Sequence, residues 1–203
     1  HGLEHDAQSY VSGTSSTTMS FGRMKGEGSF CSLTRYTGAS KRRILNGDGN
    51  WLHGHWSGSA GIAHYEGFVA GHSNMVHPNT NWAVYCLTGT GQIGWLNGVR
   101  ISGSARSQSS RNVFINKGGC CGGETSDWGA AFVISWDRDL NDEETERVSQ
   151  FMMRTTQGNQ RWPATLCSGI LQQKWWVPRV SWSGAALTIP AGQWSHVAIV
   201  FGR

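Results

Sequence analysis

Short runs in which hydrophobic and polar residues alternate follow one another along the first two thirds of the chain. The clearest runs lie at 30–36, 51–56, 62–69 and 128–136, and glycine, asparagine or serine residues separate them. Alternation with a period of two, rich in β-branched and aromatic side chains, is typical of strands that turn one face to a core. The pattern therefore predicts an all-β domain of antiparallel strands.

The most strongly patterned stretch is 82–101, around which we expect the sheets to form. Two apolar runs flank a Thr-Gly-Thr-Gly-Gln turn, and the second run ends on Leu96-Asn97-Gly98-Val99. Glycines readily adopt the positive φ angles that tight hairpin turns require. This stretch therefore predicts a β-hairpin.

One segment, 140–153, is helical in character. Asn141 is followed three residues later by Glu144, as in a capping box, and acidic residues fill the first turn. Val148, Phe151 and Met152 recur at helical spacing and mark one apolar face. We expect one short amphipathic helix that packs on a β-sandwich.

A chain of 203 residues is long enough for one β-sandwich domain and an extension. We expect a domain at 1–156, a turn-rich connector at 157–174 and a strand-forming tail at 175–203. The tail ends in the apolar run 194–201, which would promote aggregation if its backbone stayed unpaired. We predict that this run pairs with an edge of the first sandwich or with another chain's sheet. The alternative is a disordered remnant.

Composition narrows the class of partner. The formal net charge is +4, but the basic residues are scattered and only Lys41-Arg42-Arg43 forms a cluster. A nucleic-acid binder concentrates lysine and arginine on one face, so we expect no nucleic-acid partner. No apolar run approaches the roughly 18 residues of a membrane helix. We expect no membrane span, and either a processed secreted protein or a piece of a longer one.

The chain has five cysteines, Cys31, Cys86, Cys120, Cys121 and Cys167, without a C-x-x-C pair. This scatter predicts disulfides in an oxidising compartment, although reduced core cysteines of a cytosolic protein are the alternative. Cys120 and Cys121 would point in opposite directions if extended, so we expect each to bond a different partner. We predict Cys31 and Cys86 among those partners. The odd count leaves one thiol free or intermolecular.

Aromatic and imidazole side chains gather in the strands around residue 55. Aromatic rings stack on the apolar face of a pyranose, and imidazole groups hydrogen-bond its hydroxyls. The alternative is that the two tryptophans belong to the core, with the histidines on the solvent face. The candidate ligand-binding residues are Trp51, His53, His55, Trp56, His64 and Tyr65.

Metal binding has weaker support in the sequence. His53 and His55 share one face of a strand, and His64 on the next strand could be a third zinc ligand, but no fourth is evident. An N-terminal copper site would need His1 to be the mature terminus. The identity of any metal site is therefore left open.

Positive evidence for catalysis is missing from the sequence. Glu66, Glu124 and Asp127 do not form the E-x-D-x-x-E signature of jelly-roll glucanases, and there is no G-x-S-x-G elbow. We expect a protein that is not an enzyme.

Several segments resemble the laminin-G-like, concanavalin A-like jelly roll. The run 127–144 is similar to its closing strand and short helix, and 82–98 resembles its W-x-H-V-A … L-Y-V-N-G hairpin. The run 193–201 resembles its first strand. Further segments are similar to a subgroup found in large extracellular proteins of algae and other protists: 30–36, 43–45, 50–56 and 120–128. The resemblance spans about 5–153.

This resemblance implies an antiparallel jelly-roll sandwich with a short C-terminal helix, and a second laminin-G-like module that starts near Trp194. It also implies a calcium ion at one rim, for which Asp48, Asp127 and Asp137 supply oxygen donors of the required kind.

The fold alone carries many functions. We expect a non-catalytic, extracellular or cell-surface, lectin-like carbohydrate-binding or adhesion module whose partners are glycans or glycoproteins. The alternative is a structural subunit of an extracellular filament or cell-surface coat that binds other domains or copies of its own assembly. A polysaccharide-active enzyme is the minor alternative.

Overall fold

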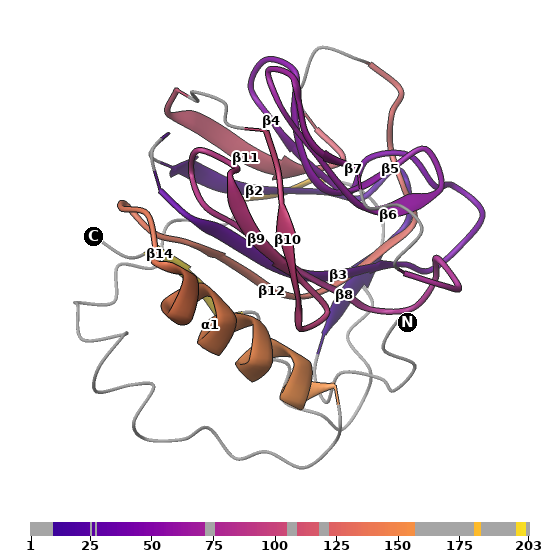
Figure 1. The fold of residues 1–203 in the computed structure, drawn as a ribbon. Coiled ribbons are helices and arrows are strands. Elements are labelled where there is room, and N and C mark those ends of the chain that lie inside the picture. Colours follow the sequence, from indigo (N-terminus) through magenta and orange to yellow (C-terminus); the bar gives the residue numbers. More distant parts are fainter. Residues whose placement is uncertain are drawn as a thin grey trace.

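The chain folds into two β-sheets that pack face to face, with one helix on the outside (Figure 1). The computed structural model describes residues 10–24, 26, 28–71, 76–104, 109–117, 122–156, 181–183 and 198–201. Within these residues each sheet has seven strands, and their pairings are antiparallel except that between β12 and β14. The prediction of an all-β antiparallel sandwich with a short helix is confirmed. Its jelly-roll assignment stays a prediction.

The first sheet, called the β12 sheet, has the order β1, β12, β3, β8, β9, β10, with β14 also beside β12. Its strands are β1 (Val11–Gly13), β3 (Phe30–Tyr36), β8 (Ala83–Leu87), β9 (Ile93–Leu96), β10 (Val99–Ser102), β12 (Trp128–Ser135) and β14 (Ala198–Phe201).

The second sheet, called the β5 sheet, has the order β13, β2, β11, β4, β5, β6, β7. Its strands are β2 (Thr18–Met24), β4 (Leu45–Gly47), β5 (Trp51–Trp56), β6 (Ser59–Tyr65), β7 (Phe68–Gly71), β11 (Arg111–Ile115) and β13 (Ser181–Ser183).

An aromatic stack lines the inner face of the β5 sheet. Gly47, Trp51 and Tyr65 are register partners across β4, β5 and β6. Trp51 and Tyr65 stack with ring centroids 5.4 Å apart, and the Arg111 guanidinium lies 5.9 Å from the Trp51 ring. Gly47 is required in this row, because a Cβ there would lie 2.9 Å from Arg111 Cδ. The row packs a buried arginine into a hydrophobic core.

The outer face of the β12 sheet is covered by α1 (Asp142–Thr155), which lies along it in Figure 1. Val148, Phe151 and Met152 of the helix belong to one buried cluster with Leu33 and Val84 of the sheet. The predicted capping box is present, since Asn141 and Glu144 each accept a hydrogen bond from the other's backbone N–H. The predicted helix and its apolar face are therefore confirmed.

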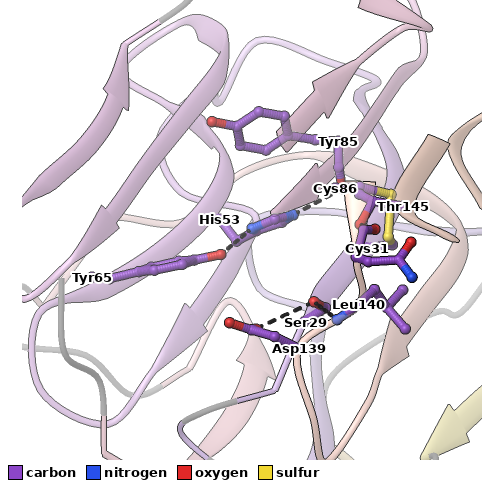
Figure 2. Close-up of a disulfide and its surroundings, with 10 residues drawn as sticks. Ser29, Cys31, His53, Tyr65, Tyr85, Cys86, Asp139, Leu140 and Thr145 are labelled. Atoms are coloured by element: carbon purple, nitrogen blue, oxygen red, sulfur yellow. Dashed lines mark hydrogen bonds between the residues drawn. A yellow bond between two sulfur atoms is a disulfide. The ribbon is translucent and has the colours of Figure 1, made fainter. Parts of the chain in front are cut away.

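Cys31 and Cys86 form a disulfide with each other (Figure 2). They are register partners on the adjacent strands β3 and β8, where side chains of one face lie within bonding reach. Both residues are thus disulfide-bonded as predicted, but the prediction that their partners are Cys120 and Cys121 is wrong. Cys120, Cys121 and Cys167 lie outside the described residues.

Two strands of the tail pair with the first sandwich. β13 is antiparallel to β2, and β14 is parallel to β12 from Phe132 to Ser135. β1 pairs with the preceding part of β12, from Trp128 to Ala130. β14 therefore continues the edge that β1 begins, which confirms the expected pairing with the sandwich. The connector 157–174 lies outside the described residues, and a second module stays a prediction.

The structure shows no helix, within the described residues, that is long and apolar enough to cross a membrane.

We expect Asn141→Ala to lower the free energy of unfolding by about 1 kcal/mol, because the Glu144 backbone N–H loses its side-chain acceptor. Asn141→Asp, which keeps an acceptor oxygen, should retain most of the stability. Urea titration followed by circular dichroism measures both. Equal stability of Asn141→Ala and the parent would contradict the role assigned to this cap.

Truncation after Thr156 removes β13 and β14, so that the β12 edge from Phe132 to Ser135 loses its partner. An unpaired edge exposes backbone hydrogen-bonding groups and promotes self-association. We expect a lower melting temperature and a larger aggregated fraction, measured by calorimetry and size-exclusion chromatography. A truncated protein as heat-stable and monodisperse as the full chain would show that these strands do not contribute.

Candidate functional site

The six predicted ligand-binding residues divide between the two faces of the β5 sheet. Trp51, His53, His55 and Tyr65 are 0% exposed and lie between the sheets. Trp56 and His64 are half-buried, and their rings both pack against the exposed ring of Phe68. The six therefore do not form one exposed platform. The alternative arrangement, with the histidines in solvent and both tryptophans in the core, is also wrong for His53, His55 and Trp56.

His53 links the two sheets through Nε2 and a neighbouring strand of its own sheet through Nδ1 (Figure 2). Nε2 lies 3.1 Å from the Tyr85 carbonyl oxygen, and Nδ1 lies 2.9 Å from the Tyr65 hydroxyl. Because a carbonyl oxygen only accepts, Nε2 carries the proton and Nδ1 accepts from Tyr65. Burial lowers the pKa of His53 to about 3, although the hydrogen bond to the Tyr85 carbonyl opposes this shift. His53 is thus a neutral core residue.

His55 is also a neutral core residue. Its Nδ1 lies 3.3 Å from Thr34 Oγ1, and its ring meets Tyr36 edge to face at 4.8 Å. Burial is the main cause that lowers the pKa of His55 to about 3, with a smaller contribution from His53. His64 does not join these two histidines, because its Nδ1 donates to the Asn50 carbonyl oxygen and its ring packs on exposed Phe68. The predicted three-histidine set is therefore not assembled.

Two of the acids considered for calcium hold loops in place. Asp127 accepts hydrogen bonds from the backbone N–H groups of Ser15 and Ser40, at 2.9 and 3.0 Å. Asp48 accepts from the backbone and side-chain nitrogens of Asn112. No group of three or more histidine, cysteine or acidic side chains suited to a metal is found in the part of the chain described. The copper candidate His1 lies outside it.

An exposed aromatic cluster lies on the outer face of the β5 sheet. Phe68 of β7 is 52% exposed, and its ring centroid lies 5.6 Å from that of Trp56 and 4.9 Å from that of His64. His64 and Phe68 are register partners on β6 and β7, which places them on one face. We call Trp56, His64 and Phe68 the outer aromatic cluster. It brings together two predicted ligand-binding residues and one that the sequence did not single out.

Trp56 and His64 are also connected by a series of polar contacts that does not involve Phe68. Trp56 Nε1 donates to Glu124 Oε1 at 3.1 Å, and the Glu124 carboxylate pairs with Arg43. Arg43 Nη2 donates to Asn50 Oδ1 at 2.9 Å, and the Asn50 carbonyl oxygen accepts from His64 Nδ1 at 2.6 Å. With the contacts of Phe68 to both residues, this series forms a closed circuit, which fixes the aromatic side chains.

The turn between β6 and β7 fixes the position of Phe68. Glu66 has φ 54°, a left-handed conformation uncommon for residues with a side chain. Its carboxylate accepts from Arg111 Nη1 at 3.2 Å and from the Asn50 backbone N–H at 3.4 Å. These contacts oppose the strain of the turn and place Phe68 beside His64.

Acid should destabilise the protein through His53 and His55. The folded state keeps both neutral to about pH 3, whereas the unfolded chain protonates them below about 6.5, so the unfolded state binds more protons in that window. We expect the free energy of unfolding to fall by about 1.4 kcal/mol per pH unit for each histidine. The pair of Glu144 with Arg138 adds to this loss only below about pH 4.5, because it lowers the pKa of Glu144 to about 2.

Denaturant titrations between about pH 7 and pH 5 measure this effect. His64→Gln is the matched control and should keep the acid sensitivity assigned to His53 and His55, because both buried histidines remain. A stability independent of pH in this range, or imidazole NMR signals of His53 and His55 that titrate normally in the folded protein, would contradict the assignment.

A scan against protein-family models and a search of curated proteins both found no match to this chain. Its laminin-G-like resemblance stays a prediction. The outer aromatic cluster and its polar contacts are the features from which a function can be inferred.

Proposed function

We propose that this chain is a non-catalytic, extracellular carbohydrate-binding or adhesion module and that the outer aromatic cluster is its ligand-binding surface. The observation that carries the proposal is Phe68, a residue that is 52% exposed while the rings of Trp56 and His64 pack against its ring. Exposed apolar side chains that gather in a patch rimmed by polar residues are typical of ligand-binding sites. A pyranose has one apolar face that stacks on such a ring and hydroxyls that reach the surrounding polar groups.

The acids considered for catalysis support a non-catalytic role. Glu124 pairs with Arg43, Glu66 pairs with Arg111, and Asp127 accepts two backbone N–H groups. Each carboxylate therefore has a structural partner. A glycosidase instead needs two carboxyl groups that face one another across the scissile bond.

The disulfide supports an extracellular location. Cys31 and Cys86 are both buried, under α1, and the bond joins two central strands of the β12 sheet. Stable structural disulfides are typical of oxidising compartments.

We expect Phe68→Ala to weaken glycan binding at least about tenfold, which corresponds to about 1.4 kcal/mol of lost stacking and apolar contact. The fold should be retained because Phe68 is already 52% exposed and lies outside the core. A glycan array identifies a ligand, and isothermal titration then measures its affinity for the parent and the variant.

The matched control is Val99→Ala, which removes another exposed apolar side chain, 51% exposed on β10 of the opposite sheet. This variant should bind like the parent. The proposal would be overturned if neither the glycan array nor retardation of the protein in polysaccharide gels showed binding. Equal losses of glycan affinity in Phe68→Ala and Val99→Ala would overturn it as well.

A further inference from the structure

We infer that the outer aromatic cluster takes uncharged glycans and discriminates against glycans that carry carboxylate or sulfate groups. The inference rests on the proposed function and names its ligand class. It runs against the bulk charge of the chain, since a formal net charge of +4 would favour acidic polysaccharides. Its basis is the way in which charged side chains are arranged around the cluster.

Both ion pairs beside the cluster have the cation inside and the anion outside. The side chain of Arg43 is 6% exposed and that of its partner Glu124 is 24% exposed. The side chain of Arg111 is 2% exposed and that of its partner Glu66 is 48% exposed. At these two ion pairs a ligand therefore meets carboxylate oxygens and not guanidinium groups.

The two arginines are held in these buried positions by further contacts. Arg111 donates to the carbonyl oxygens of Ser109 and Asp48, at 3.1 and 3.4 Å, and lies over the ring of Trp51. Arg43 donates to Asn50 Oδ1. Turning either side chain outward to meet an acidic ligand would break these bonds and leave a carboxylate without its partner.

Of the two lysines with described contacts near the β5 sheet, one is held by a neighbouring loop and the other lies far from the cluster. Lys41 Nζ donates to Asn79 Oδ1 at 2.9 Å. Lys117 lies over the ring of Phe114 on β11, and β4, β5 and β6 separate that strand from β7. Four strand spacings amount to about 19 Å, which exceeds the roughly 8 Å over which charges act at physiological salt.

The hydrogen-bonding groups at the cluster fit hydroxyls. His64 Nδ1 donates to the Asn50 carbonyl oxygen, which leaves Nε2 as the ring nitrogen that a ligand can reach and, in the neutral tautomer, as an acceptor. Asn50 Oδ1 accepts a hydrogen bond from Arg43, so the Asn50 side chain offers a ligand its amide nitrogen as a donor. With Glu124 and Glu66 as further acceptors, the surface matches hydroxyls, which can both donate and accept. A sulfate or carboxylate, which only accepts, is matched by Asn50 alone within this circuit of contacts.

The test compares soluble uncharged polysaccharides, a β-glucan and a mannan, with alginate and a sulfated galactan, in affinity electrophoresis and titration with the full chain. We expect binding to at least one uncharged polymer, with a dissociation constant that changes less than about twofold between low and physiological salt. Phe68→Ala should weaken it about tenfold, and Val99→Ala should not. Acidic polymers should show only salt-sensitive retention that Phe68→Ala leaves unchanged.

Two results separate the failure of this inference from that of the proposed function. Tight binding of an acidic polymer at physiological salt, lost in Phe68→Ala, would overturn the inference and leave the glycan-binding role in place. The absence of binding to every polymer would overturn both.

A second variant tests the charge argument directly. Phe68→Lys places a cation at the exposed centre of the cluster and leaves Arg43 and Arg111 in the sequence unchanged. Relative to Phe68→Ala, it should raise the affinity for the acidic polymers at low salt about fivefold and leave the uncharged polymers unchanged. An equal response to both classes would show that local charge does not determine the choice.

Discussion

A buried guanidinium is the constraint on which the second sheet depends. Removing a charged group from water costs several kcal/mol unless oxygen acceptors replace the lost hydration. Arg111 meets most of this need with Glu66, the Asp48 and Ser109 carbonyl oxygens and the face of Trp51, although its Nη2 is buried without a hydrogen-bond partner among the described residues. Because these partners come from β5, from the turns that follow β4 and β6 and from the segment before β11, one side chain fixes the relative positions of several chain segments.

This arrangement connects the core to the outer face of the sheet. Glu66 is bound on one side to Arg111, whose guanidinium lies over the Trp51 ring. On the other side it is bound to the backbone N–H of Asn50, whose carbonyl oxygen orients His64. The aromatic stack inside and the aromatic cluster outside are therefore not independent. Substitutions that disturb the packing of Trp51 or Gly47 are expected to move the turn before Phe68 as well.

The sequence predicted local features well and long-range ones poorly. Alternation located most strands, and Asn141 with Glu144 marked the start of α1, because both signals come from neighbouring residues. The inward direction of His53 and His55 could not be predicted, because both faces of the run Trp51-Leu52-His53-Gly54-His55-Trp56 carry apolar side chains. What decides their direction is an acceptor on β8 and a hydroxyl on β3, which lie far away in sequence.

The same limit explains the disulfide and Phe68. The pairing of Cys31 with Cys86 follows from the adjacency of β3 and β8, and strand order is not encoded in the spacing of cysteines. Phe68 was missed because it follows a two-residue turn, after which the sequence does not show which face the next strand turns outward. The direction of Phe68 follows from the turn at Glu66, which has φ 54° and is held by the hydrogen bond from Arg111.

The disulfide also determines how the chain is tied together covalently. Its two cysteines are separated by 55 positions, and this loop contains β4, β5, β6 and β7, and with them Trp56, His64 and Phe68. In a chain-entropy model, closing a loop of this length removes about 4 kcal/mol of freedom from the unfolded chain. A protease that cuts once between β7 and β8 would therefore leave two fragments joined through sulfur, so that an opened backbone need not release the strands that carry the aromatic cluster.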